Sequence, residues 1–159
     1  MTDMELTLKR ASESDAELIW RMQIESFAQM YARYQDDQTS PAKEPIDKVI
    51  ARLRQPYTYY YLIETGEGIA GAIRVVDFHE EGKPKRISPL FILPKFRNRG
   101  LAQAAIQAAE RIHGEKNWLL DTIEQEEGNC HLYEKMGYQR MDRTEAINDR
   151  MTLVFYEKK

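Results

Sequence analysis

The stretch from residue 88 to residue 110, SPLFILPKFRNRGLAQAAIQAAE, constrains the fold more than any other part of the chain. Its first six residues are mostly apolar and predict a buried strand that Pro94 ends. A short basic turn with Gly100 follows, and the alanine-rich run from Leu101 predicts a helix to about His113. The first amides of a helix have no internal acceptor, and the helix dipole adds positive charge there. Gly100 also allows close approach of the backbone, so this turn predicts an anion site.

The rest of the chain predicts one domain over residues 1–159, without repeats or linkers. Capping oxygens before apolar residues at helical spacing predict helices, and β-branched or aromatic runs predict strands. The predicted strands cover residues 5–10, 57–64, 69–77, 86–93, 117–123, 138–145 and 151–157, and the helices cover about 16–34, 45–54, 101–113 and 130–136. This order is an α/β arrangement in which one parallel pair of strands lies within a mostly antiparallel sheet.

Composition excludes several classes of function. With 23 Lys and Arg against 26 Asp and Glu, the net charge is -3, which argues against a general nucleic-acid-binding protein. No stretch approaches the roughly 20 apolar residues that span a bilayer, and the first residues lack a signal pattern, so we expect a cytoplasmic protein without membrane contact. Cys130 is the only cysteine. Because His79, His113 and His131 are far apart in the sequence, no metal site is expected.

The glycine turn alone is open to more than one interpretation. A P-loop requires Gly-Lys-Ser/Thr, which this chain lacks, and a dinucleotide-binding fold places its glycine loop after the first strand. A phosphate cradle and a solvated basic turn before an ordinary core helix are equally good explanations of the turn by itself.

Two motifs together resemble the GNAT superfamily, the acetyl-CoA-dependent N-acetyltransferases. Its pyrophosphate motif is [Q/R]-x-x-G-x-[G/A] after an apolar strand and a proline, and here FILPKF is followed by RNRGLA at residues 97–102. Its later signature, Leu-Tyr-Glu-Lys-x-Gly-aromatic, stands here as LYEKMGY at residues 132–138. The two motifs are separated by one predicted helix and one predicted strand, as in the family, and the resemblance covers nearly the whole chain.

The resemblance implies the GNAT fold, with a splayed parallel strand pair and flanking helices, and acetyl-CoA as acyl donor. Amides from Arg99 to Ala102 would bind the pyrophosphate. The strand residues would pair with the pantetheine arm, and the thioester would lie in a gap between residues 88–93 and 119–123. The implied cofactor contacts are Phe91, Ile92, Leu93, Arg97, Asn98, Arg99, Gly100, Leu101, Ala102, Asn129 and Tyr133.

The chain departs from the family at one position. Many members have an asparagine seven residues before the signature tyrosine, where this sequence has Glu126, and Asn129 lies only four residues before it. Whether Glu126 or Asn129 replaces the family contact is therefore open, and capping of the short helix is an alternative role for Asn129.

The resemblance also implies acetyl transfer to a primary amine by direct attack, with Tyr133 as the general acid for the departing thiolate. The amine must lose a proton, and the strand before the loop contains no carboxylate. Glu124 is the first candidate for the base, and Asp121, Glu126 and an ordered water are alternatives.

The resemblance implies the chemical class of the acceptor but not its identity. GNAT proteins form the acceptor site in the segment that corresponds to residues 25–44, which carries Tyr31, Tyr34, Asp36 and Asp37 and would suit a cationic small-molecule or peptide amine. Some tyrosines of residues 57–61 could also line this cleft. Because dimers are common in the family, the resemblance is also compatible with a homodimer. Two alternatives remain, namely a non-catalytic acyl-CoA-binding module and an acyltransferase that uses a longer acyl-CoA.

Overall fold

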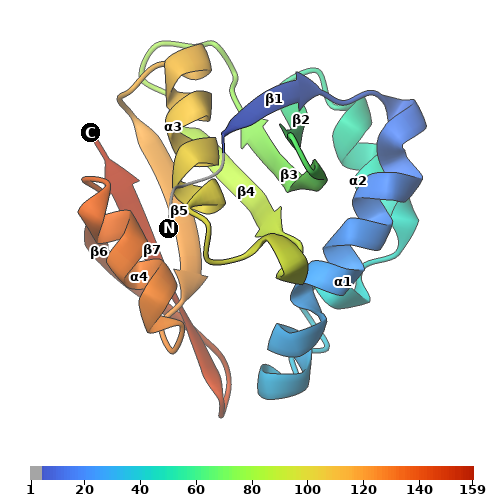
Figure 1. The fold of residues 1–159 in the computed structure, drawn as a ribbon. Coiled ribbons are helices and arrows are strands. Elements are labelled where there is room, and N and C mark those ends of the chain that lie inside the picture. The colour runs from blue at the N-terminus through green and yellow to red at the C-terminus, as the bar shows by residue number, and fades with distance from the viewer. Residues whose placement is uncertain (1–4) are drawn as a thin grey trace.

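The computed structural model describes residues 5–159 and contains one seven-stranded sheet with helices on both faces (Figure 1). The spatial order of the strands is β1-β2-β3-β4-β5-β7-β6. The strands are β1 (Leu6–Arg10), β2 (Thr58–Thr65), β3 (Gly68–Val76), β4 (Lys85–Ile92), β5 (Trp118–Ile123), β6 (Gln139–Asn148) and β7 (Met151–Lys158). The helices are α1 (Ala16–Tyr34), α2 (Ile46–Arg54), α3 (Leu101–His113) and α4 (Glu127–Lys135), and three short 3-10 turns include Pro41–Lys43 and Pro94–Phe96.

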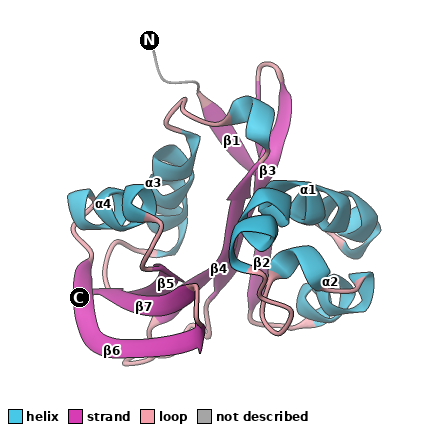
Figure 2. Cartoon of the chain, turned by 90° about the horizontal axis from the view of Figure 1, so that it is seen from below, coloured by secondary structure: helices cyan, strands magenta, loops and turns pink. Residues whose placement is uncertain are grey.

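The helices divide between the two faces of the sheet. Figure 2 shows α1 and α2 on one face and α3 and α4 on the other. Small and branched side chains of α3, among them Ala105, Ile106 and Ala109, are fully buried against the sheet. The alanines allow the helix to approach the strands closely, which explains why this helix is rich in alanine.

The sheet separates in its middle. β4 and β5 are the only parallel neighbours, and they pair through Lys85 with Trp118 and through Arg86 with Leu119, with no further pair along the two described strands. Beyond Arg86 the strands diverge, as Figure 1 shows. All other neighbouring strands are antiparallel. The splayed parallel pair in a mostly antiparallel sheet is therefore confirmed.

All of the predicted helices and strands are present. One helix, α4, starts at a different residue from the one predicted. The last helix begins at Glu127, three residues earlier than the apolar pattern indicates, and its N-cap residue is Glu126. Asn129 therefore lies inside α4, and its predicted role as the helix cap is wrong. Among the described residues, no helix is both long and apolar enough to traverse a bilayer.

Candidate active site

The N-terminus of α3 opens into a cavity. Gly100 is the N-cap residue in the left-handed region, with φ of 74°, and in the described chain no side chain caps this helix start. The first intrahelical bond is donated by Ala104 N to Gly100 O at 3.0 Å, which leaves the amides of Leu101, Ala102 and Gln103 without an intrahelical acceptor. The adjoining cavity, called here the helix cavity, has a volume of about 480 Å³. Its lining includes Phe27, Leu90, Phe91, Ile92, Arg97, Asn98, Gly100, Leu101, Ala102, Glu126, Asn129 and Tyr133.

The open edge of β4 supplies further backbone groups to this cavity. Leu93 N donates to Ala70 O of the neighbouring chain segment at 2.7 Å, and Phe91 is paired with Ala72 on β3. Because hydrogen-bonding direction alternates along an antiparallel strand, Ile92 points its N–H and C=O away from β3, toward the gap. Of the three predicted pantetheine contacts, Ile92 directs its backbone groups at the gap, where its N–H faces the cavity and its C=O accepts from Arg97. Phe91 and Leu93 direct theirs at the sheet.

Both arginines of the loop are engaged in contacts within the protein. Arg97 donates to the backbone oxygens of Ile92 at 3.1 Å and Ser26 at 2.5 Å, and to the Gln29 side chain at 3.3 Å. Arg97 thereby ties the loop to α1. Arg99 forms a 3.0 Å ion pair with Glu67 in the β2–β3 turn. The sequence predicts the positive charge at this loop but gives no signal for these partners.

A second cavity, called here the inner cavity, adjoins the first and has a volume of about 260 Å³. Tyr133 of α4 lines both cavities, and so do Asn129, Leu90, Phe27 and Met30. The two spaces therefore meet where β4 and β5 have separated. Other residues of the inner cavity include Tyr31, Tyr34, Asp36, Thr39, Ser40, Ser88, Asp121 and Thr122.

The phenol of Tyr133 is suited to give a proton. Burial raises the pKa of Tyr133 to about 12, and the negative charge of Asp121 and the neighbouring Cys130 act in the same direction. The hydroxyl is therefore protonated at neutral pH. Asn129, one turn earlier on α4, donates from Nδ2 to Oγ1 of Thr122 at 3.3 Å and so joins the helix to β5.

The three candidate carboxylates occupy different places. Glu124 is exposed, forms an ion pair with Arg140 and lines neither cavity. Glu126 lines the helix cavity and accepts bonds of 2.5 Å from both Arg33 and Tyr34.

The third carboxylate lies in the inner cavity. Asp121 forms a 3.2 Å ion pair with Arg86, and it is close enough to Tyr133 to influence the pKa of that phenol. The structure therefore places Asp121, and not Glu124, beside the candidate acid.

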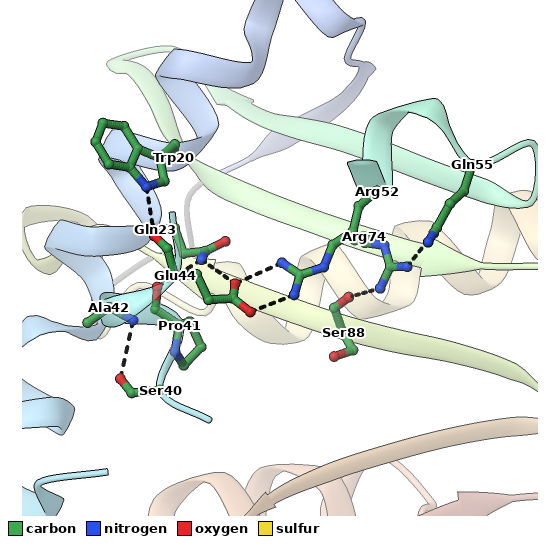
Figure 3. Close-up of polar contacts among 10 residues, drawn as sticks. All are labelled: Trp20, Gln23, Ser40, Pro41, Ala42, Glu44, Arg52, Gln55, Arg74 and Ser88. Carbon is green, nitrogen blue, oxygen red and sulfur yellow. Dashed lines mark hydrogen bonds and ion pairs between the residues drawn. The ribbon is translucent and has the colours of Figure 1, made fainter. Parts of the chain in front are cut away.

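A partly buried polar network, drawn in Figure 3, fixes the loop between α1 and α2. Trp20 Nε1 donates to Glu44 O at 2.9 Å, and Gln23 Nε2 donates to Pro41 O at 2.9 Å and to Glu44 Oε1 at 2.8 Å. Arg52 of α2 binds both carboxylate oxygens of Glu44, at 2.8 and 2.6 Å. The network anchors the loop between α1 and α2, of which Thr39, Ser40 and Pro41 line the cavity.

Electrostatics favour the charged form of Glu44. Burial alone would raise its pKa, but the hydrogen bonds and charge of Arg52, with the bond from Gln23, outweigh it and lower the pKa. The adjoining Arg74 donates to Ser88 O at 2.7 Å and to Gln55 Oε1 at 2.8 Å, which holds β4 at the cavity (Figure 3). The sequence motifs do not indicate this network, because its members are scattered along the chain and none belongs to a recognisable motif.

The tyrosines of β2 lie away from both cavities. Tyr60 is buried on the side of Arg52 and Arg74, and Tyr61 bonds His113 of α3 on the opposite face. Their alternation across the strand is as expected, but within the described chain none of residues 57–61 lines either cavity.

Comparison with known proteins places this geometry in context. The chain matches the model of the family described as Acetyltransferase (GNAT) family over residues 19–138. An acetyltransferase from Thermus thermophilus has a similar structure, with a TM-score of 0.72 at 18% identity, covering 98% of this chain and 97% of that one. Spermidine N-acetyltransferase from Vibrio cholerae, solved with CoA and spermine, gives a TM-score of 0.74 at 16% identity, covering 95% of this chain and 93% of that one. No curated protein matches the sequence.

Proposed function

The chain belongs to the GNAT acetyltransferase family, and from this premise we propose that it transfers an acetyl group from acetyl-CoA to a primary amine. The observation that carries the proposal is the course of the two cavities. The helix cavity begins at the free amides of α3, follows the open edge of β4 and reaches Tyr133, where the inner cavity begins. A phosphate-bearing donor in the first cavity and an amine in the second would thus meet at a protonated phenol.

The residues of the helix cavity fit the donor. The amides of Leu101, Ala102 and Gln103, at the positive end of the α3 dipole, suit a pyrophosphate. The apolar residues of β4 that line this cavity, Leu90, Phe91 and Ile92, suit a pantetheine arm. Bound acetyl-CoA supplies an activated thioester, and Ile92 N–H is the proposed donor to the oxyanion that develops on its carbonyl.

The inner cavity fits a small amine. Its aromatic wall and the carboxylate of Asp121 suit a cationic group with an apolar neighbour. The Vibrio cholerae protein solved with spermine supports this class of acceptor. We assign Asp121, directly or through a water, to remove the proton of the amine, and Tyr133 to protonate the departing thiolate.

Two measurements test the proposal. Release of the CoA thiol from acetyl-CoA is followed across a library of amines, and acetyl-CoA binding is measured by calorimetry for wild type and Gly100→Glu. The new side chain and its negative charge would enter the phosphate cradle, so binding is expected to be lost. Gly82→Glu is the matched control, because Gly82 also has a positive φ, of 86°, but lies outside both cavities.

The outcomes separate the alternatives. Unchanged binding by Gly100→Glu contradicts the placement of the donor. Binding of acetyl-CoA without thiol release for any amine favours a non-catalytic acyl-CoA-binding module. Faster turnover with longer acyl-CoA donors favours an acyltransferase of different donor preference.

A further inference from the structure

A second group of polar side chains lies outside both cavities, at the far end of α3. Asp77 follows β3, His79 lies two residues later, and His113 is the last residue of α3. Each of the three residues offers one ligand atom, and these atoms all lie within 4.8 Å of one another. The helix rises about 1.5 Å per residue, so this cluster is about 18 Å from the start of α3.

The separations within the cluster are close to those of metal ligands. Oδ2 of Asp77 is 2.8 Å from Nδ1 of His113 and 3.6 Å from Nε2 of His79. Ligands about 2.0–2.1 Å from a tetrahedral ion lie about 3.3 Å from each other, and the two observed distances bracket that value. The 2.8 Å contact is a hydrogen bond in the structure, and the three ligand atoms lie within 4.8 Å of one another, so the side chains would rotate to place them around one ion.

The surroundings hold these side chains in place. Oδ1 of Asp77 accepts from the backbone N of His79 at 2.8 Å, which leaves Oδ2 directed at the two imidazoles. Nε2 of His113 lies 2.8 Å from the hydroxyl of Tyr61, an arrangement that fixes the ring and leaves Nδ1 as the inward atom. The hydroxyl of Tyr59 lies 2.7 Å from Nε2 of His79, and this contact would open when that nitrogen binds an ion.

Two of the three side chains are buried. The side chains of Asp77 and His113 are 7% and 3% exposed, whereas that of His79 is 62% exposed and leaves the cluster open on one side.

We propose that Asp77, His79 and His113 form a binding site for a divalent transition-metal ion of the Zn²⁺ class. Two imidazole nitrogens and one carboxylate oxygen are the donor set of such ions, whereas Mg²⁺ and Ca²⁺ prefer oxygen ligands alone. The exposed side leaves a fourth position for water. The ion would clamp the C-terminal end of α3 to the segment after β3, so its effect is on stability and not on the acetyl-transfer site. Arg10 and Lys85 lie near the surrounding aromatic rings and temper the affinity by their charge.

The test uses the whole protein after removal of metals with a chelator. Zn²⁺ binding is measured by calorimetry, and Co²⁺ binding by the visible absorption of tetrahedral cobalt. We expect one ion per chain, a rise in thermal midpoint with Zn²⁺, and no such response to Mg²⁺. His79→Ala removes an exposed ligand without opening the core and is expected to weaken Co²⁺ binding about tenfold or more. The matched control is His131→Ala, which removes the exposed histidine of α4 and should leave binding unchanged.

Each of the following outcomes would contradict the proposed metal site. Absence of stoichiometric Zn²⁺ and Co²⁺ binding means that the cluster is only a hydrogen-bonded network. Equal affinity in wild type and His79→Ala, or loss of binding in His131→Ala, places the ion elsewhere. A response to Mg²⁺ equal to that of Zn²⁺ contradicts the assigned ligand chemistry.

Discussion

The backbone oxygen of Ile92 accepts a 3.1 Å hydrogen bond from Nε of Arg97, five residues further along the chain. The same guanidinium reaches Ser26 O on α1, so it ties together the open strand edge, the loop and the first helix. The arginine at the first position of the phosphate motif therefore acts on the shape of the loop.

Replacing Arg97 tests this role. Arg97→Ala removes charge-assisted bonds worth about 1.5–3 kcal/mol each, so acetyl-CoA binding measured by calorimetry is expected to weaken about tenfold or more. Arg97→Lys keeps the charge, but one ammonium cannot reproduce the planar fork that serves Ile92 O and Ser26 O together. Full rescue by lysine would mean that charge alone matters at this position. Arg99→Ala, at the exposed pair with Glu67, should have a smaller effect that salt weakens.

Loss of the Tyr133 hydroxyl should slow turnover and spare binding. Tyr133→Phe keeps the ring in place, so we expect kcat to fall about 100-fold while the Kd for acetyl-CoA changes little. Tyr156→Phe is the control, because its hydroxyl bonds Glu134 and it lines neither cavity. Since the pKa of Tyr133 is raised to about 12, its proton remains in place to about pH 10, and no alkaline loss of rate should arise from it below that pH. Wild-type kcat in Tyr133→Phe would remove this residue as the acid.

Two carboxylate variants distinguish the candidate bases. Asp121→Asn is expected to lower kcat/KM for the amine about 100-fold. Glu124→Gln should remain within about twofold of wild type, because an exposed ion pair contributes little. The opposite pattern would restore Glu124 as the base, and near-normal activity in both variants would favour a water.

The Glu44–Arg52 pair should stabilise the fold in a pH-dependent manner. The pKa of Glu44 is lowered in the folded protein, so its contribution is present above the ordinary pKa of a glutamate and is lost as the pH falls through the lowered value. Glu44→Gln is expected to reduce the free energy of unfolding by about 2 kcal/mol at neutral pH and by less in acid, measured by urea denaturation. It should also raise KM for the amine, because the loop of the inner cavity is released.

The control for this prediction is Glu17→Gln. Glu17 pairs with Arg21 on the exposed side of α1, and such a pair contributes about 0.5 kcal/mol at most. Equal destabilisation by both variants would contradict the structural role of Glu44.

Local patterns were sufficient for much of the fold. The alternation and composition of the strands, the apolar spacing of α1 and α2, and the glycine before α3 are local signals, and the structure has these elements with small shifts at their ends. The separation of the parallel strands β4 and β5, in contrast, was predicted from the resemblance of two motifs to the GNAT superfamily. The start of α4 was misplaced because Glu127 and Gly128 carry no apolar signal, although they begin the helix whose Cys130 and Tyr133 pack against the core.

Long-range contacts account for what the sequence could not predict. The hydrogen bond from Arg97 to Ser26 joins residues 71 positions apart, and the partly buried bond from Gln23 to Glu44 joins residues 21 positions apart. Likewise His79 and His113 are distant in the chain, yet the course of β3 and α3 brings them to one end of the sheet. Only the tertiary arrangement decides which of several equivalent polar residues meet.

An unpaired strand edge usually lies at the rim of a sheet, where another polypeptide can add to it and begin aggregation. Here such an edge lies in the interior, between β4 and the diverging β5, and helices α1 and α4 carry side chains that line the same space. Since this edge lies between two strands of the same sheet, it is not at the rim, where a strand of another copy of the protein would pair with it.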